Sequence, residues 1–325
     1  MRALSLLIIL LIFTNIIEAR TLTDDYGRVV NVPDTVTKIY SSSPSLTIAL
    51  TAFDPSLVAG LNFPFKPDQK PYVGVAASRP VVGGYFGQGN TPNIEVLASL
   101  KPDVILMWGS ATGAENQLKQ LTALGIPVLM VRDDSINDLA GEFTLFGKLT
   151  GNTKRSHELI AYTKETLGLI QSLQNKVNAR KDVRFYFAEG LDGMSSECEG
   201  SRHIEPFTYS GGKNAINCKV SSTYGMEKMS MEQIILADPD MIIAMEPSFV
   251  ESIATNPKWK MLRAVKTGHV LTVPNSPFNY ISRPPSLARL MGIRWLIHTF
   301  YPDLIAPIDQ EKKRFEKLFF PYYKP

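Results

Sequence analysis

Two stretches of this chain carry the same order of polar and apolar positions. In each, an acidic residue opens a short run with apolar residues three apart, a proline followed by aspartate stands seven residues later, and an unbroken apolar run follows. The acids are Glu95 and Glu232, 137 residues apart, and the prolines are Pro102 and Pro239. Proline cannot continue a helix, and an unbroken apolar run is typical of a parallel strand covered on both faces. Each stretch therefore predicts a short helix, a turn and a buried strand.

The repeat predicts two α/β lobes of similar build, although a helix, a Pro-Asp turn and a strand also form a common unit within single α/β domains. Two lobes enclose a cleft, and clefts between domains are frequent ligand sites. Ser45 is expected to cap a helix over 46–53. The other expected elements are a hairpin over 22–32, strands over 38–43, 127–131, 183–188 and 270–274, and helices over 114–124 and 287–300.

A proline-free stretch between the two repeats predicts one long helix. From about 138 to 180, apolar residues recur every three or four positions. The part Thr153–Asn178 would be about 39 Å long as an unbroken helix, which makes a stiff connector. We expect an N-terminal lobe at 20–150, a connecting helix at 151–180 and a C-terminal lobe at 181–325.

Residues 1–19 have the pattern of a secretory signal peptide. Arg2 supplies the positive charge, Leu6–Ile17 the apolar segment, and Ala19 a small residue at the cleavage site. An uncleaved membrane anchor is the alternative, but this apolar segment is short for a bilayer span. We expect an exported, periplasmic protein whose mature chain begins near Arg20.

The charge balance and the cysteine count narrow the class further. The chain has 34 Lys and Arg against 31 Asp and Glu, with no basic block interleaved with aromatic residues, so a nucleic-acid partner is not expected. Its two cysteines are Cys198 and Cys218, and two cysteines of one exported chain usually pair. Closing that loop of about 20 residues would contribute roughly 3 kcal/mol in the chain-entropy model. A zinc site is the alternative, but only His203 stands close to Cys198.

These patterns together resemble the class III substrate-binding proteins, which deliver vitamin B12, siderophores and haem to ABC importers. The resemblance covers nearly all of the mature chain. It is carried by the order and spacing of 41–47, 93–107, 121–131, the long helix, 211–215, the second repeat, 268–274 and 283–301. It implies two Rossmann-like lobes bridged by one long helix, with the ligand cleft between them. It also implies a monomer without an intrinsic cofactor or metal site, whose cargo is a bound metal complex.

The resemblance also implies where the protein meets its importer. In this family, one glutamate on the upper surface of each lobe contacts arginines of the permease dimer in the inner membrane. By motif, these glutamates are Glu95 and Glu232. Charge complementarity of this kind mainly supplies steering and register. Each acid also suits the first turn of a helix because of the helix dipole, and both roles can hold at once.

Candidate ligand contacts come from the loops of both lobes. The candidates are Tyr85, Trp108, Arg202, His203, Tyr209 and Arg283. An arginine side chain suits carboxylates, phosphates and oxyanions, and Trp108 ends a predicted strand, where ligands bind in open α/β sheets. The Gly-, Pro- and aromatic-rich segment 61–92 is expected to be an exposed loop, in which binding residues concentrate. Arg283 could instead pair with a surface acid, and His203 could be structural.

Catalysis finds little support in the sequence. There is no GxSxG, HExxH or Walker A motif. The lobes also resemble cobalt and iron chelatases, but a signal peptide argues against that reading, because tetrapyrrole assembly is normally cytoplasmic. Within the binding class, the cargo stays open between a metal chelate and an oxyanion. The chelate would be a ferric siderophore, cobalamin, haem or a nickel or cobalt complex, and the oxyanion would be molybdate or tungstate.

Overall fold

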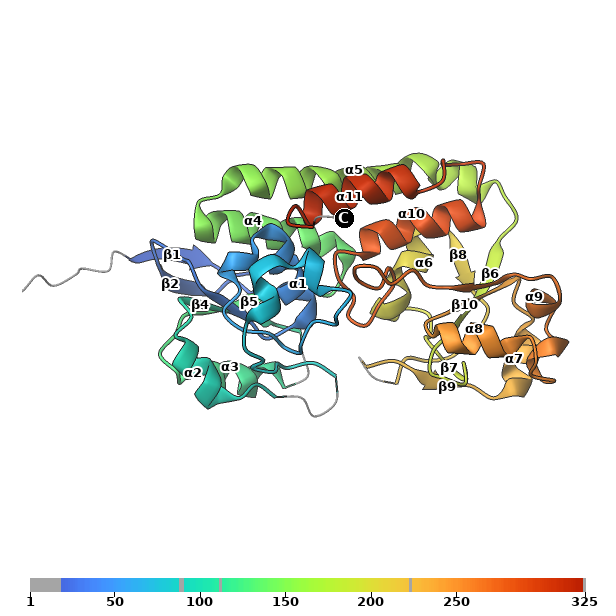
Figure 1. Ribbon diagram of the computed structural model, residues 1–325, viewed down its shortest axis with the longest axis horizontal. Helices are drawn as coiled ribbons and strands as arrows, with labels where there is room; N and C mark the ends of the chain where they lie inside the picture. The colour runs from blue at the N-terminus through green and yellow to red at the C-terminus, as the bar shows by residue number, and fades with distance from the viewer. Residues whose placement is uncertain (1–18, 88–90, 111–112, 222–223, 324–325) are drawn as a thin grey trace, which may run out of the picture.

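The computed structural model describes residues 19–323 except 88–90, 111–112 and 222–223. It shows two α/β lobes side by side, with long helices running along one side of both (Figure 1). The expected signal peptide lies outside the described residues, apart from Ala19. Among the described residues, no helix is both long enough and apolar enough to cross a membrane.

The N-terminal lobe is built on a parallel sheet of three strands in the order β3 (Ile39–Ser41), β4 (Val104–Trp108) and β5 (Val128–Val131). The apolar run that begins β4 is fully buried, as expected for a strand covered on both faces. The predicted hairpin is present as the antiparallel pair β1 (Ala19–Thr23) and β2 (Val29–Pro33).

The helices of this lobe flank the sheet. They are α1 (Pro44–Phe53), α2 (Ile94–Leu100), α3 (Ala114–Thr122) and α4 (Leu139–Thr150), with 3-10 turns η1 (Pro55–Leu57), η2 (Lys70–Tyr72), η3 (Gly74–Ser78) and η4 (Ile136–Asp138). The prediction that Ser45 caps the first of these helices is wrong. The helix begins earlier, with Ser43 as N-cap and Pro44 in the first turn, where a missing N–H leaves no helical bond unmade.

The segment 61–92 differs from the exposed loop that its composition predicts. Phe65, Tyr72 and Val73 are buried in the main core. The ring of Tyr72 stacks on Tyr323 at 3.9 Å between centroids. The first half of the segment is therefore largely packed structure, and Phe65 and Tyr72 belong to the core.

The C-terminal lobe is built on a parallel sheet of four strands in the order β11 (Val270–Thr272), β10 (Met241–Ala244), β6 (Val183–Ala188) and β8 (Gly212–Asn214). A small antiparallel pair lies beside it. The remaining elements are β7 (Ser195–Ser196), β9 (Glu227–Lys228), η5 (Arg202–Ile204), α6 (Glu205–Tyr209), α7 (Met231–Ala237), α8 (Pro247–Ile253), η6 (Trp259–Met261) and α9 (Arg263–Lys266).

The sequence repeat is a structural repeat. It forms α2 with β4 in one lobe and α7 with β10 in the other (Figure 1). The carboxylate of Asp103 accepts the N–H of Lys38, and the carboxylate of Asp240 accepts the N–H of Arg184. In return, the N–H of Asp103 donates to the carbonyl of Lys38, and the N–H of Asp240 donates to the carbonyl of Arg184, at 2.8 Å in both lobes. The aspartate of each Pro-Asp pair thus ties the new strand to its neighbour.

The predicted connector is α5, with the bounds Thr153–Asn178. It is one of several helices on that side, because α10 (Arg289–Phe300) and α11 (Asp309–Phe319) run alongside it (Figure 1). The sequence analysis did not predict α11. Its Phe319 packs on Phe143 of α4, so the end of the chain belongs with the connector and the N-terminal lobe rather than with a lobe at 181–325.

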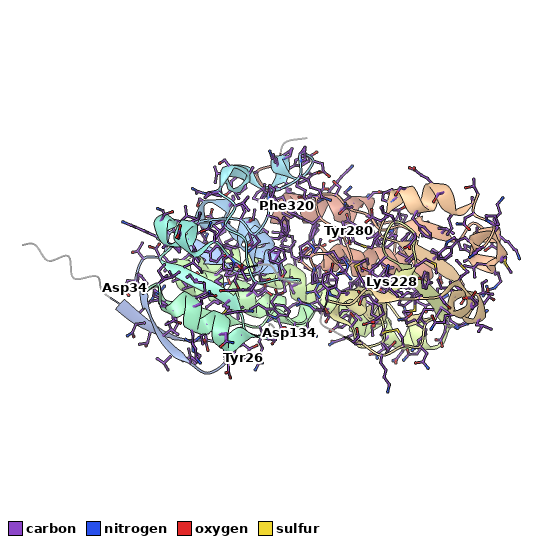
Figure 2. All side chains as sticks on the ribbon, turned by 90° about the horizontal axis from the view of Figure 1, so that it is seen from below. Tyr26, Asp34, Asp134, Lys228, Tyr280 and Phe320 are labelled. Atoms are coloured by element: carbon purple, nitrogen blue, oxygen red, sulfur yellow. A yellow bond between two sulfur atoms is a disulfide. The ribbon has the colours of Figure 1, made fainter. Side chains whose placement is uncertain are left out.

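One hydrophobic cluster of the described residues extends from the N-terminal lobe into the C-terminal lobe, while each lobe also has a smaller cluster of its own. It includes Leu106 of β4, Leu159 of α5, Phe187 of β6 and Met291 of α10. Figure 2 places Tyr280 and Phe320, two further members of this cluster, near the middle of the molecule. Because close-packed cores resist deformation, a shared core couples the lobes more tightly than a single connecting helix would.

Candidate ligand-binding site

A cavity of about 900 Å³ lies between the two lobes. The N-terminal lobe lines it with aromatic rings, and the C-terminal lobe lines it with basic side chains. The aromatic residues of the N-terminal lobe are Phe63, Tyr85, Phe86 and Trp108. The C-terminal lobe contributes the basic residues Arg202, His203 and Arg283, together with one aromatic residue, Tyr224. The volume falls in the range of pockets that enclose drug-sized ligands, and a bare tetrahedral oxyanion would fill only a small part of it.

The strands of both sheets direct their carboxyl ends at this cavity. Trp108 is the last residue of β4, Ser43 follows β3 by two residues, and Glu189 follows directly after β6. Parallel strands end at one edge of their sheet, so side chains from distant parts of the sequence meet there. The prediction that Trp108 lies at a strand end facing the ligand site agrees with this arrangement.

Arg202 of the C-terminal lobe stacks on Trp108 of the N-terminal lobe. The guanidinium carbon lies 4.6 Å from the centre of the indole ring. The indole Nε1 donates to the carboxylate of Asp134 at 2.9 Å, which holds the ring in place. Figure 2 shows Asp134 at the edge of its lobe that faces the other lobe. A cation over an aromatic face is an attractive pair, so this contact joins the lobes at the cavity wall.

Asp133 gives Arg202 a buried negative partner. Arg202 donates to the backbone carbonyl of Asp133, and its Nη2 lies 3.6 Å from the Asp133 carboxylate. The hydroxyls of Ser43 and Ser45 also donate to that carboxylate. Burial raises the pKa of Asp133, and the charge of Arg202 opposes the rise. The positive charge of Arg202 is therefore balanced inside the protein before any cargo arrives.

Arg283 makes more hydrogen bonds within the protein than Arg202 does. Its Nε donates to Glu189 at 2.6 Å, and its Nη2 donates to Glu189 at 3.3 Å and to Glu197 at 2.6 Å. Its Nη1 donates to the carbonyl of Tyr224 at 3.2 Å. These four bonds occupy four of the five N–H donors of a guanidinium, which leaves one donor on Nη1 for a ligand.

The two glutamates beneath Arg283 are 1% and 0% exposed. Burial raises the pKa of Glu189 to about 8, the bonds from Arg283 oppose the rise, and the neighbouring carboxylate of Glu197 adds to it. Arg283 itself has φ of 60°, a left-handed conformation that is rare for a residue with a side chain. The surrounding ion pairs hold it there, as is common at functional sites.

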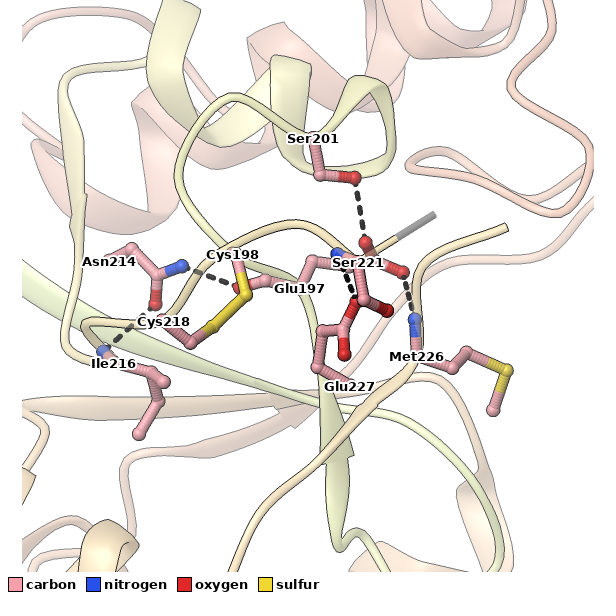
Figure 3. Close-up of a disulfide and its surroundings, with 9 residues drawn as sticks. All are labelled: Glu197, Cys198, Ser201, Asn214, Ile216, Cys218, Ser221, Met226 and Glu227. Atoms are coloured by element: carbon pink, nitrogen blue, oxygen red, sulfur yellow. Dashed lines mark hydrogen bonds between the residues drawn. A yellow bond between two sulfur atoms is a disulfide. The ribbon is translucent and has the colours of Figure 1, made fainter. Parts of the chain in front are cut away.

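The loop that carries Arg202 and His203 is closed by a disulfide. Cys198 and Cys218 are joined, as the sequence analysis expects (Figure 3). Next to Cys198, the carboxylate of Glu197 accepts bonds from the hydroxyl of Ser201 and the N–H of Met226 (Figure 3). The disulfide therefore lies one residue from a carboxylate that holds Arg283.

Five of the six predicted ligand residues line the cavity, and Tyr209 does not. The five are Tyr85, Trp108, Arg202, His203 and Arg283. Tyr209 lies on α6, and its hydroxyl instead contacts the side-chain amide of Asn137 in the other lobe. Nearby, Glu205 accepts bonds from the hydroxyl of Ser135 and the N–H of Ile136. Tyr209 thus belongs to the junction between the lobes.

Tyr85 and His203 are nearly buried and reach the cavity through part of their surface. The hydroxyl of Tyr85 donates to the Oε1 of Gln120 at 2.6 Å, and burial raises the pKa of Tyr85. The Nδ1 of His203 lies 2.5 Å from the hydroxyl of Ser282, next to Arg283 in the chain. Sequence reasoning missed Ser43, whose only signal is its place just after a strand.

Glu95 and Glu232 occupy matching positions outside the cavity. Each is exposed and is the second residue of its helix, α2 and α7. Both helices lie at the far ends of the lobes, on the side opposite α5 (Figure 1). Hydrogen bonds from its own backbone N–H and from Ser230 lower the pKa of Glu232. Both acids are accessible to a partner, and both also sit at a helix N-terminus.

Two parallel-sheet lobes that enclose a cavity and share a helical side define a protein that captures a ligand between its lobes. Residues 49–277 match the family model described as periplasmic binding protein, and the chain belongs to this family. An ABC transporter solute binding protein from Sulfurospirillum deleyianum is 31% identical. It superposes with a TM-score of 0.84 over 93% of this chain and 95% of that one.

Several relatives carry names that specify a ligand, and they include vitamin B12-binding proteins such as that of Salmonella typhi. The molybdate-binding protein MolA of Haemophilus influenzae is 25% identical over 94% of this chain and 92% of its own. The Fe(3+)-citrate-binding protein YfmC of Bacillus subtilis is 28% identical over 57% of each chain. The family consists of substrate-binding proteins of ABC transporters, so the predicted family, fold and class of function are confirmed.

Proposed function

We propose that this protein captures a metal chelate in the periplasm and delivers it, chemically unchanged, to an ABC importer. This proposal rests on the size and lining of the cavity. Its volume of about 900 Å³ suits an organic ligand that surrounds a metal, and its N-terminal wall of aromatic rings suits the apolar or flat parts of such a ligand.

The acidic partners of the two arginines indicate what net charge the cargo carries. Arg202 is balanced by Asp133, and Arg283 by Glu189 and Glu197. A site with unpaired cations would require a strongly anionic cargo, whereas balanced arginines contribute directed N–H donors with little net charge. The proposed cargo is therefore a chelate that is neutral or carries a small negative charge.

Molybdate is the second candidate, and the relationship to MolA favours it, because that match spans nearly the whole of both chains. The chemistry is compatible, since the lining includes Ser43, Ser45, Arg202 and His203, all of which can donate hydrogen bonds to an oxyanion. The size of the cavity argues for the chelate.

Delivery is the other half of the proposal. The mature protein acts as a monomer after its signal peptide is removed, and Glu95 and Glu232 bind basic residues of the permease dimer. Changing both glutamates to alanine is expected to reduce uptake by cells while leaving cargo affinity unchanged, because neither acid lines the cavity. Changing both to lysine should reduce uptake further, since like charges across an interface repel. Normal uptake by the double variant would contradict the docking role.

Analysis of the protein purified from its own periplasm tests the cargo. Native mass spectrometry should find an added mass larger than an inorganic anion, and metal analysis should find a metal in equal amount. Titration with ferric citrate, cobalamin, haem and molybdate then compares affinities directly. Molybdenum bound without an organic ligand would reject the chelate in favour of the second candidate. A bound compound released in altered form would reject the proposal of binding without catalysis.

A further inference from the structure

Leu236 is 86% exposed, the highest value among the exposed large hydrophobic side chains of the described residues. It lies on α7, the helix that presents Glu232. Residues four apart in a helix lie on the same face, so the acid and the leucine stand one above the other. The opposite side of α7 is buried through Met231 and Ile234. An isolated exposed leucine is ordinary, and the position beside Glu232 is what distinguishes this one.

The matching helix of the other lobe lacks this apolar side chain. The repeat aligns Glu95 with Glu232, so the position of Leu236 is taken in α2 by Ser99. Ser99 is exposed, and its hydroxyl donates to the carbonyl of Val96 in its own helix at 2.7 Å. Helix α2 therefore presents an acid with a polar neighbour, whereas α7 presents an acid with an apolar neighbour.

The C-terminal lobe has a second exposed apolar residue near an ion pair that reaches the end of α7. Met261 is 59% exposed and stands two residues before Arg263. The guanidinium of Arg263 bonds Asp238 at 3.2 Å and Asp240 at 2.8 Å, and Asp238 stands two residues after Leu236. The ion pair thus brings the two chain segments together.

We propose that Leu236 is an apolar anchor of the importer contact, so that the C-terminal lobe grips the permease more tightly than the N-terminal lobe does. This inference rests on the docking role proposed above for Glu95 and Glu232. The surface fits a membrane-protein partner with a basic side chain opposite Glu232 and, about one helical turn away, an apolar recess that accepts a leucine. Charge complementarity sets the register of such a contact, and the buried apolar side chain slows dissociation.

The test measures binding of the ligand-free protein to its importer held in lipid nanodiscs, with the importer chosen as one that the wild-type protein binds. The variants are Leu236→Ala, Leu236→Ser, Glu232→Gln and Glu95→Gln. Val75→Ala is the matched control, because Val75 is 54% exposed but lies in the 3-10 turn η3 of the N-terminal lobe, outside α2 and α7. Thermal melting confirms that each variant is folded, and no change is expected because Leu236 is exposed.

We expect Leu236→Ala to weaken importer binding about tenfold, mainly through faster dissociation, since that is the scale of burying one leucine side chain. Leu236→Ser should weaken importer binding further, and Val75→Ala should bind the importer as tightly as the wild type does. Wild-type binding by both Leu236 variants, with weakened binding by Glu232→Gln, would overturn the anchor and leave acid docking intact. Wild-type binding by every glutamate and leucine variant would overturn the anchor and the proposed docking role together.

Discussion

The two lobes are built on the same frame and contribute different chemistry to the cavity between them. In both, a short helix, a Pro-Asp turn and a buried strand repeat, down to the bonds of Asp103 with Lys38 and of Asp240 with Arg184. The N-terminal lobe then adds aromatic rings to the cavity wall, whereas the C-terminal lobe adds Arg283 and the other basic side chains.

The difference lies mainly in the loops. In the C-terminal lobe, Arg202 and His203 stand on the loop closed by the disulfide, and Arg283 stands on the loop between β11 and α10. Loops can change without disturbing the sheet that positions them, so one frame can serve different cargoes. The repeat therefore indicates the architecture, and the parts that do not repeat determine what is bound.

The two arginines also differ in how they are balanced. Arg202 takes its carboxylate, Asp133, from the opposite lobe, whereas Arg283 takes Glu189 and Glu197 from its own. Arg202 consequently links the lobes, and Arg283 is part of a buried cluster within one lobe.

Replacing Arg283 should be the most damaging change. Arg283→Ala leaves the buried carboxylate of Glu197 without its cation and Glu189 without its hydrogen-bond donor, and removing one partner of a buried pair costs about 3–5 kcal/mol. We expect the free energy of unfolding at neutral pH to fall by about that amount in urea denaturation. Cargo affinity should fall as well, most strongly for an anionic cargo. Arg263→Ala, which breaks the surface ion pairs with Asp238 and Asp240 in the same lobe, is the control and should cost less than about 1 kcal/mol. Equal losses in the two variants would contradict this account.

Removing the disulfide comes next. The double variant Cys198→Ser with Cys218→Ser frees a loop of 20 residues, which should lower the free energy of unfolding by about 3 kcal/mol. Cargo binding should weaken too, because the loop positions Arg202 and His203. Thiol labelling of the denatured, unreduced wild type should find no free cysteine. Labelling of both cysteines would show that the bond does not form in the exported protein.

Glu189 should make the folded protein less stable as the pH rises. Its pKa rises from 4.5 in the unfolded chain to about 8 in the folded protein, so the folded state holds the extra proton between these values. The contribution of Glu189 to stability therefore declines as pH rises through this window and levels off above about 8.

Glu189→Gln tests this dependence. The variant should lose less stability between pH 5 and pH 8 than the wild type, as measured by urea denaturation at a series of pH values. Glu227→Gln is the control, because the bonds from Ser221 lower the pKa of Glu227 and place its titration below this range. The assignment fails if Glu189→Gln and the wild type have the same pH profile above pH 5.

The smallest expected change is in the overall shape. Because one core runs through both lobes and the helices beside α5, cargo should close the lobes only slightly. Small-angle scattering of the protein with and without its co-purified cargo should give nearly equal radii of gyration. A decrease of several ångström would show that the lobes move as separate bodies.

The elements of this protein were largely predictable from its sequence. The two helix–Pro-Asp–strand units, the hairpin and the helix Thr153–Asn178 all follow from local periodicity and from proline, which act over a few residues. The site was partly predictable for a related reason. Residues such as Trp108 stand at strand ends, and parallel strands direct those ends to a common edge.

Which distant residues meet depends on how the whole chain packs. The pairing of Arg283 with Glu189 joins residues 94 positions apart, and the contact of Tyr209 with Asn137 joins residues 72 positions apart. Such pairs depend on the path of whole loops and on burial, which makes an unpaired charge costly wherever the fold happens to enclose it. The same holds for Phe319, whose ring packs on Phe143 of the N-terminal lobe although the two residues are far apart in the sequence. Local pattern determined the parts of this protein, and long-range packing determined how the parts form a binding site.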